Sequence, residues 1–260
     1  MSQTVADIKA RLDAADEEEF VVLERSLRGD TRKGVLIALA KARKRLDALA
    51  QESARVKSLY DFERELSGGK VVVGLDEVGR GPLAGPLSVG AVVLDPEAPF
   101  VEGLNDSKQI PEDKRDAVAA KARSASLAYC VVHVPPQQID EEGMSACLRK
   151  AFLEAVERIE VQVGRVDVIL LDGNPLHLDP REINVIKGDS KCASIAAASV
   201  IAKVERDSLM REYDKQYPGY DFASSKGYGS KKHRDAIAEL GLSPIHRASF
   251  CTNFLQERLF

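Results

Sequence analysis

The sequence contains few cysteines and no closely spaced pair of them. Four cysteines occur among 260 residues, and they lie far apart without a Cys-x-x-Cys motif. A structural zinc site therefore has weak support, and disulfides are uncommon in the cytosol. We expect free thiols at all four positions, which are Cys130, Cys147, Cys192 and Cys251.

Long apolar runs are also missing. No segment approaches the roughly 18 consecutive apolar residues of a membrane span, and the N-terminal segment lacks the apolar core of a signal peptide. With 44% hydrophobic and 30% charged residues, the composition is that of an ordinary globular protein. We expect a cytoplasmic, monomeric protein without a membrane partner.

An overall positive charge is absent as well. Acidic residues outnumber basic ones by 41 to 37, which gives a net charge of −4 and counts against a protein that coats nucleic acid nonspecifically. A local basic face is nevertheless visible near the C-terminus, and it indicates either a nucleic-acid contact or an ordinary solvated surface. Its residues are Lys226, Lys231, Lys232, His233, Arg234, His246 and Arg247.

Residues 1–66 form a separate helical extension in our interpretation. Between Arg32 and Glu65, apolar residues recur at helical spacing among many charged ones. The Ser-Gly-Gly sequence at 67–69 breaks this pattern and predicts a linker. The extension either packs on the body of the protein, which we favour, or contacts the substrate through a basic cluster. That cluster comprises Lys41, Arg43, Lys44 and Arg45.

Residues 70–260 predict a mixed α/β domain with a central sheet. Short β-branched runs predict strands, whereas amphipathic or alanine-rich stretches predict helices. A meander of strands followed by strands alternating with helices is typical of a mixed sheet flanked by helices, and helical segments continue to the C-terminus. The expected strands are 70–75, 87–94, 128–134 and 166–171, and the expected helices are 111–124, 144–160 and 190–207.

The most informative segment is Gly74–Pro86, in which two acids at the end of a strand run into a glycine-rich turn. On an extended strand Asp76 and Glu77 would point to opposite faces, so they serve one site only where the strand ends or bulges. The glycines let a phosphate approach the backbone. A dinucleotide fingerprint is rejected, because it requires a helix at the glycines and Pro82 interrupts the segment.

Two further acids are candidates for the same site. Asp172 closes an apolar strand, where ligand sites gather in α/β sheets, and a turn-forming Asp before Gly173 is the alternative. Asp189 either binds a metal or caps the helix that follows it. Asp207 is excluded, because it lies about 27 Å from Asp189 along a continuous helix that rises 1.5 Å per residue.

A site made only of carboxylates suits hard divalent cations. Mg²⁺ and Mn²⁺ prefer oxygen ligands, whereas zinc is bound mostly by nitrogen and sulfur. Two such ions about 4 Å apart activate a water and stabilise the leaving oxygen of a phosphodiester. Clustered acids, the glycine-rich turn and the basic face together predict phosphodiester hydrolysis.

The motifs resemble, in their order along the chain, those of ribonuclease HII, the bacterial type 2 ribonuclease H. The resemblance covers about residues 70 to 250 and implies a ribonuclease H-like fold. It also implies that four carboxylates bind Mg²⁺ or Mn²⁺ and carry out hydrolysis, namely Asp76, Glu77, Asp172 and Asp189. The matching motifs are Gly74–Pro86, Asn105–Lys108, Leu171–Gly173, Lys187–Lys191, Ser194–Ser199, Ala202–Asp207, Lys226–Gly229 and His246–Arg247.

The resemblance further implies substrate contacts. The turn Gly79-Arg80-Gly81 is expected to touch the backbone around the scissile phosphate and to sense the ribose 2′-OH. Tyr228 is expected to stack on the following deoxyribose, unless it is ordinary surface packing. Ser107 or Lys108 is expected to contact a phosphate, unless this segment is only a turn and helix cap.

The implied activity is endonucleolytic hydrolysis of the RNA strand of RNA–DNA hybrids. It includes nicking on the 5′ side of single ribonucleotides in duplex DNA, which leaves 3′-OH and 5′-phosphate ends. Two other functions stay open. A nucleotide-binding phosphotransferase requires a helix after Gly81, and a noncatalytic nucleic-acid binder would bind duplexes without the acids.

Overall fold

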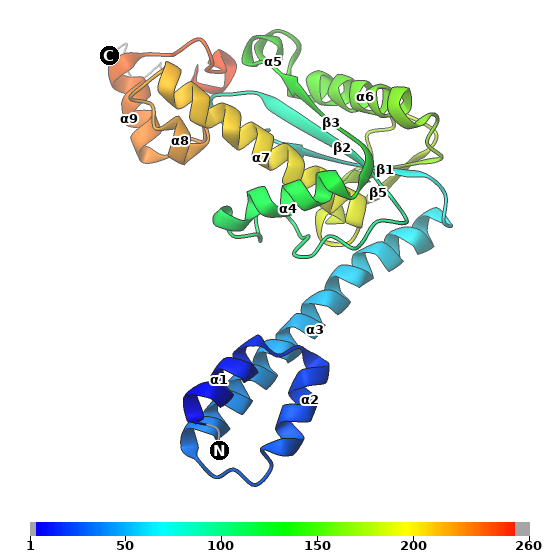
Figure 1. Cartoon of the computed structure of the whole chain (residues 1–260). Coiled ribbons are helices and arrows are strands. Elements are labelled where there is room, and N and C mark those ends of the chain that lie inside the picture. Colours follow the sequence, from blue (N-terminus) through cyan, green and yellow to red (C-terminus); the bar gives the residue numbers. More distant parts are fainter. Residues whose placement is uncertain (1–3, 253–260) are drawn as a thin grey trace. The chain divides into compact units, whose positions relative to one another are not determined.

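The computed structural model describes residues 4–252, and the chain divides into two compact units, Met1–Arg55 and Val56–Phe260. The first unit contains helices α1 (Val5–Ala14) and α2 (Glu17–Ser26) and the first part of α3 (Lys33–Ser67) (Figure 1). No helix among residues 4–252 combines the length and the apolar character needed to span a membrane. All four cysteines are free, as predicted.

The basic cluster of the first unit serves mainly the packing of that unit. Lys41 pairs with Asp13 at 3.1 Å, and Arg43 pairs with Glu17 at 2.6 Å. Arg45 donates to the carbonyl oxygen of Ala15, at the end of α1. These side chains hold the three helices together, which favours a packing role for them over a substrate contact.

The second unit is built on a mixed five-stranded sheet in the order β3-β2-β1-β4-β5. The first three strands form an antiparallel meander, and β4 and β5 add to the other side of β1 in parallel orientation. The strand β2 (Leu87–Leu94) lies between β1 and β3 and is therefore buried along nearly its whole length. The strands are β1 (Val72–Val78), β2 (Leu87–Leu94), β3 (Ser126–Val134), β4 (Val168–Asp172) and β5 (Glu182–Val185).

Helices cover both faces of the sheet (Figure 1). On one face lies α6 (Met144–Val163), whose buried residues recur every three to four positions, and the short α5 (Pro136–Glu142) precedes it. On the other face lies α7 (Ala193–Gln216), against which α4 (Glu112–Ser124) packs. The expected fold class, a mixed sheet between helices, is confirmed.

Glycine on two strands lets α7 lie unusually close to the sheet. A Cβ atom added at Gly74 would overlap Ser194 Oγ and the backbone of Ile195, and one at Gly90 would come within 2.5 Å of the Ala198 carbonyl oxygen. The facing stretch of α7 is alanine-rich and fully buried. Small residues on both surfaces therefore set the distance between helix and sheet.

The last turns of α3 belong to the second unit. The Glu63 carboxylate accepts hydrogen bonds from Ser194 N–H and Oγ at 2.7 Å each, at the first turn of α7. The Tyr60 hydroxyl accepts one from the Val101 amide at 3.1 Å. Residues 68 and 69, the two glycines of the expected linker, follow the helix with positive φ angles.

Two expectations about local structure were incomplete or wrong. The helix expected from Ser190 begins at Ala193, because Gly188–Ser190 forms a separate 3₁₀ turn. The strand β5 and the helix α5 were not predicted. Both are short, and β5 carries charged and polar residues on an edge of the sheet, so it lacks an apolar signal.

The C-terminal region surrounds two buried histidines. It contains α8 (Phe222–Ser225), α9 (Lys231–Leu240) and the 3₁₀ turn Ala248–Phe250. His233 Nε2 lies 3.0 Å from His246 Nε2, and both imidazoles are buried. They pack against the rings of Tyr220 and Phe222.

Hydrogen bonds at both ends of the histidine pair fix its tautomers. The Ser243 amide donates to His246 Nδ1 at 2.8 Å, so the proton of His246 is on Nε2 and points at His233. His233 Nδ1–H in turn donates to the carbonyl oxygen of Tyr228 at 2.8 Å. Both rings are therefore neutral in this arrangement. Burial, together with the neighbouring imidazole, lowers the pKa of His246 to about 4.

Replacing Gly74 by alanine tests the close packing of α7. The added methyl group overlaps backbone atoms, so we expect Gly74→Ala to lower the free energy of unfolding by about 1–3 kcal/mol. Urea denaturation measures this change. Gly29→Ala is the matched control, because nothing lies within 4 Å of its new methyl group. Equal stability of both variants would contradict the account.

The histidine pair predicts a loss of stability in weak acid. The folded-state pKa of His246, about 4, lies below its ordinary value of about 6.5. The unfolded chain therefore binds the proton first, and stability that is complete above pH 6.5 is lost as the pH falls toward 4. In urea denaturation at pH 7.5 and 5, we expect His246→Gln to weaken this pH dependence. His177→Gln, on an exposed loop, should leave it unchanged, and equal slopes for both variants would refute the assignment.

Candidate active site

Asp76 and Asp172 lie next to each other at the carboxyl ends of two parallel strands. In the register of β1 and β4, Leu75 pairs with Leu171, so the acids that follow occupy backbone positions about 4.8 Å apart. Side chains alternate along a strand, and both leucines belong to the core beneath α6. The two acids therefore face α7.

The turn that carries Asp189 is tied to Asp172. The Gly188 amide donates to Asp172 Oδ1 at 2.6 Å, which brings the 3₁₀ turn Gly188–Ser190 to the same edge of the sheet. Asp189 caps no helix, because α7 begins at Ala193 with Cys192 as its N-cap residue. The capping alternative is therefore wrong, and the largely buried Asp189 carboxyl group is close enough to Asp172 to be influenced by its charge.

Glu77 lies one residue before the end of β1, where the sequence required a strand end or a bulge. Its side chain forms an ion pair with Arg80 at 3.2 Å. Its amide donates to Asp76 Oδ1 at 2.8 Å. Burial raises the pKa of Glu77, the Arg80 guanidinium opposes this shift, and the Asp172 charge adds to it. The Glu77 carboxyl group is thus influenced by the charges of both Arg80 and Asp172.

Burial and, to a smaller extent, neighbouring acids raise the pKa values of two of these carboxyl groups. Burial raises the pKa of Asp76 to about 8, and the charges of Glu77, Asp172 and Asp189 contribute in the same direction. Burial also raises the pKa of Asp189 to about 6, together with the charges of Asp106 and Asp172. Such mutual repulsion is relieved when a cation lies among the carboxylates.

The donor set fits a hard divalent cation. All four candidate ligands are carboxylates, and oxygen-only sites favour Mg²⁺ or Mn²⁺. Within residues 4–252, no three acids, cysteines or histidines form a ready-made coordination group, and Glu77 is held by Arg80. Metal binding by these four residues therefore stays a prediction.

Ser107 and Lys108 lie on the α7 side of the acids and differ in exposure. Ser107 is buried, and its hydroxyl lies at hydrogen-bond distance, 3.1 Å, from that of Ser199, which also bonds to Asp76. The Lys108 side chain is 81% exposed, and its ammonium is attracted by Asp76 and Asp189. Its amide donates to Asp106 at 2.9 Å, so the expected turn is also present. These positions favour Lys108 for a phosphate contact.

Ser199 was not singled out from the sequence. It is a hydroxyl within the alanine-rich, buried part of α7, and a polar side chain in such surroundings needs a partner. Its bonds to Asp76 and Ser107 connect α7 to the acid cluster. That isolated polar position was the available signal, but its partners depend on the tertiary structure.

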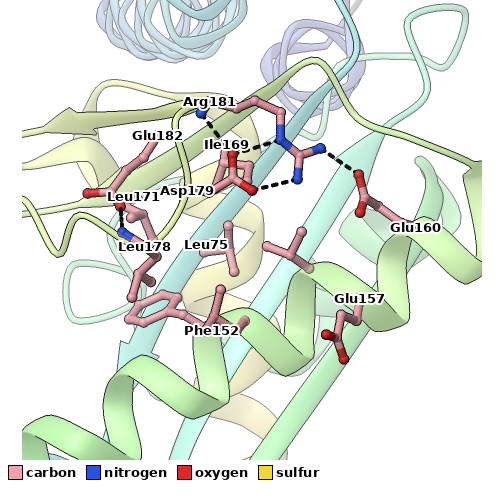
Figure 2. Close-up of a pocket in the computed structure, with 12 residues that line it drawn as sticks. Leu75, Phe152, Glu157, Glu160, Ile169, Leu171, Leu178, Asp179, Arg181 and Glu182 are labelled. Carbon is pink, nitrogen blue, oxygen red and sulfur yellow. Dashed lines mark hydrogen bonds and ion pairs between the residues drawn. The ribbon is translucent and has the colours of Figure 1, made fainter.

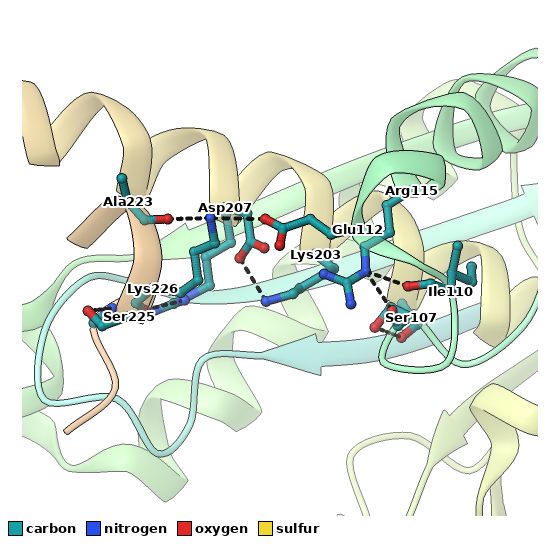
Figure 3. A network of polar contacts seen from close by, with 12 residues as sticks. Ser107, Ile110, Glu112, Arg115, Lys203, Asp207, Ala223, Ser225 and Lys226 are labelled. Atoms are coloured by element: carbon teal, nitrogen blue, oxygen red, sulfur yellow. Dashed lines mark hydrogen bonds and ion pairs between the residues drawn. The ribbon is translucent and has the colours of Figure 1, made fainter. Parts of the chain in front are cut away.

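Asp207 belongs to a polar network that connects α7 with α4 and with the segment around Lys226, as Figure 3 shows. Asp207 pairs with Lys203 at 2.8 Å on the same helix, in agreement with its exclusion from the site. Lys226 pairs with Glu112 of α4 at 3.3 Å. Arg115 donates to the carbonyl oxygen of Ser107 at 2.8 Å and so fixes the segment before α4.

The glycine-rich turn leads into a strand. Residues 79–86 contain no helix, and β2 begins at Leu87. The nucleotide-binding alternative, which required a helix after Gly81, is therefore wrong. Gly79 has φ +91°, and a Cβ atom there would overlap the Arg206 guanidinium, so only glycine fits this position.

Tyr228 lies directly beside this turn. The nearest atom to a Cβ built on Gly81 is Tyr228 Cε1, at 3.8 Å, and the tyrosine is 45% exposed. The amides of Leu83 and Ala84 donate to the carbonyl oxygen of Gly227 at 2.9 and 3.3 Å. Two segments that are distant in sequence are thus joined into one surface.

Only some residues of the basic face expected near the C-terminus are exposed to solvent. Lys231 and Lys232 are exposed, each paired with an aspartate. His233, His246 and Arg247 are buried. The sequence alone does not reveal that these three side chains are buried and form hydrogen bonds inside the protein.

A separate cavity of about 200 Å³ lies on the α6 side of the sheet (Figure 2). Leu75 and Leu171 line it, so it is separated from the acids by the thickness of the sheet. The charged residues at its rim pair with one another: Arg181 pairs with Asp179 at 2.8 Å and with Glu160 at 2.6 Å. The cavity is therefore not part of the acid site.

Comparison with known proteins identifies the family. A sequence model described as "Ribonuclease HII" matches residues 73–253, and one described as "Ribonuclease HII N-terminal domain" matches residues 4–67. The chain is 40% identical over 252 residues to "Ribonuclease HII" of Listeria monocytogenes, and the match covers 96% of this chain and 95% of the relative.

Solved structures agree in fold. The ribonuclease H2 of Pyrococcus horikoshii OT3 superposes with a TM-score of 0.60 and 28% identity, over 72% of this chain and 97% of that one. Bst-RNase HIII in complex with Mn²⁺ superposes with a TM-score of 0.56 over 80% of this chain and 74% of that one, but at 16% identity it supports the fold alone.

These matches confirm the fold, the enzyme class and the family predicted from the motifs. Family members of this kind are nucleases that depend on divalent metals and act on RNA–DNA hybrids. The chain belongs to the ribonuclease HII family.

Proposed function

We propose that the protein nicks duplex DNA on the 5′ side of single embedded ribonucleotides, besides cutting the RNA strand of hybrids, and leaves 3′-OH and 5′-phosphate ends. One observation carries this proposal. Asp76 and Asp172 lie side by side in the register of β1 and β4, and the glycine-rich turn follows β1. Tyr228 lies beside this turn, and hydrogen bonds hold its segment there. The strand β1 thus carries two of the acids, and the turn that follows it forms part of the proposed sugar-recognition surface.

The four carboxylates, Asp76, Glu77, Asp172 and Asp189, are the proposed ligands of two Mg²⁺ or Mn²⁺ ions. When bound, such ions supply an activated water and stabilise the leaving oxygen. The protein's own contribution is to hold the ligands: Ser199 bonds to Asp76, and the Gly188 amide bonds to Asp172. Oxygen-only donor sets favour these hard cations, and Bst-RNase HIII, which shares the fold, has been solved in complex with Mn²⁺.

Recognition of the ribonucleotide is assigned to the turn and the tyrosine. The 2′-OH is the group that distinguishes RNA from DNA at a given sugar. An exposed aromatic ring next to Gly81 offers a flat surface for the following deoxyribose, where an additional hydroxyl would be crowded. Arg80 and Lys108 are exposed cations beside the acids and are the proposed phosphate contacts.

We further propose that the protein acts as a cytoplasmic monomer with a helical extension, residues 1–66, and a catalytic domain, residues 70–260. The two family models, which match 4–67 and 73–253, support this division. The compact units divide earlier, after Arg55, because the last turns of α3 pack with the sheet domain.

Cleavage of a labelled duplex that contains one ribonucleotide tests the catalytic assignment. With Mg²⁺ or Mn²⁺ we expect a nick 5′ to the ribonucleotide, and none with EDTA. Asp172→Asn should lower the rate by roughly 10³-fold, because loss of a metal ligand removes several kcal/mol of transition-state stabilisation. The matched control is Asp116→Asn, on the exposed face of α4, which should cut like the wild type. Metal-independent cutting, or duplex binding without any cutting, would contradict the proposal.

Replacement of Tyr228 tests sugar recognition. Tyr228→Ala should reduce kcat/KM on the single-ribonucleotide duplex by about tenfold, as expected for the loss of one stacking contact. Tyr228→Phe keeps the ring and should retain most of the activity. If both variants lost activity equally, the hydroxyl rather than the ring face would be the functional group.

A further inference from the structure

Two arginines are buried behind the glycine-rich turn. Arg206 and Arg247 have no exposed surface and are the largest fully buried side chains of the described chain. Every hydrogen bond that the structure gives their guanidinium groups goes to a main-chain carbonyl oxygen. Among residues 4–252, neither group forms an ion pair with a carboxylate. The fold therefore keeps two cations inside without an acidic partner.

All three guanidinium nitrogens of Arg247 donate hydrogen bonds to the turn. Nη2 donates to the Gly79 carbonyl oxygen at 2.6 Å, and Nη1 donates to that of Arg80 at 3.0 Å. Further bonds reach the carbonyl oxygens of Pro82 at 3.0 Å and of Gly85 at 2.8 and 3.0 Å. Its rigid fork of five donors thus binds four carbonyl groups of one loop.

Arg206 connects the same loop to the tyrosine segment. Nε donates to the Pro86 carbonyl oxygen at 2.9 Å, and Nη2 donates to that of Ala84 at 3.3 Å. Nη1 donates to the carbonyl oxygen of Lys226 at 2.9 Å, two residues before Tyr228. One side chain therefore fixes the turn and the tyrosine segment relative to each other.

Burial of these charges is costly, so their retention calls for a reason. A guanidinium removed from water loses strong hydration, and carbonyl groups offset this loss only in part. Burial and the neighbouring Arg206 guanidinium lower the pKa of Arg247 to about 10, so the group is still a cation at neutral pH. The positive charge is thus present directly behind the turn.

The orientation of the carbonyl groups determines where the amides of the turn point. In a trans peptide the C=O and N–H groups point in opposite directions. With the carbonyl oxygens of Gly79 and Arg80 on Arg247, the amides of Arg80 and Gly81 point away from it. Within residues 4–252 these two amides have no hydrogen-bond partner. Successive free amides of this kind bind anions.

We propose that Arg247, supported by Arg206, is a positioning residue that presents the Arg80 and Gly81 amides to a phosphate of the substrate. The buried charge behind the turn adds a positive potential at the same point. The link to Lys226 also sets the distance between these amides and Tyr228. This inference rests on the proposed function, because it names the part of the substrate that the turn binds.

The test is Arg247→Lys, which keeps the cation but replaces the five-donor fork by a single ammonium. On the single-ribonucleotide duplex with Mg²⁺, we expect KM to rise by about tenfold, the effect of losing one well-placed contact, while kcat changes much less. Damage that is merely structural would lower the fraction of active enzyme, so kcat would fall and KM would stay. Unchanged KM in a folded variant, whatever the kcat, overturns the inference.

Arg181→Lys is the matched control. Arg181 also has a fully bonded guanidinium, but it lies in the network with Asp179 and Glu160 on the α6 side of the sheet (Figure 2). Its KM should equal that of the wild type. A rise equal to that of Arg247→Lys would show a general effect of arginine replacement and would overturn the inference.

A measurement on the wild type keeps the inference testable if Arg247→Lys fails to fold. Addition of the duplex in EDTA should shift the amide NMR signals of Arg80 and Gly81, and unshifted signals on a bound duplex overturn the inference. Failure of the proposed function is distinguishable. In that case the wild type does not cut the duplex with either metal, whereas failure of this inference leaves wild-type cutting intact.

Discussion

The close contact between α7 and the sheet determines the rest of the catalytic unit. Because Gly74 and Gly90 leave no side chains in between, one helix reaches both the acids and the turn. Ser199 lies beneath Asp76, and Arg206, two turns further along α7, lies behind the glycine-rich loop. Any change in the distance between helix and sheet therefore displaces the acids and the glycine-rich turn together.

The site places a cluster of acidic groups next to a pair of buried cationic groups. Carboxylates crowd the ends of β1 and β4, where burial and mutual repulsion raise the pKa of Asp76 to about 8. Buried guanidinium groups lie behind the adjoining turn. A phosphodiester with its divalent cations carries the complementary pattern: in the proposed complex the cations would meet the acids and the phosphate would meet the turn. Each half costs stability in the free protein and is stabilised by the substrate complex.

Local chemistry could be predicted from the sequence, whereas tertiary partners could not. The strand at 87–94 and the acids at strand ends have clear local signals, and the ordered motifs identify the family. The start of α7 was misplaced, because the 3₁₀ turn around Asp189 depends on the bond from Gly188 to Asp172. Arg247 was assigned to a surface for the same reason: nothing near it in sequence reveals the carbonyl groups that it binds.

The central claim is that the acids at the ends of β1 and β4 form the metal site of this enzyme. The most direct measurement is anomalous X-ray diffraction from crystals of the wild-type protein with Mn²⁺ and a duplex that contains one ribonucleotide. The account predicts anomalous peaks within coordination distance of the Asp76 carboxylate, close to the scissile phosphate. Peaks only elsewhere on the protein, with the duplex bound, would contradict it.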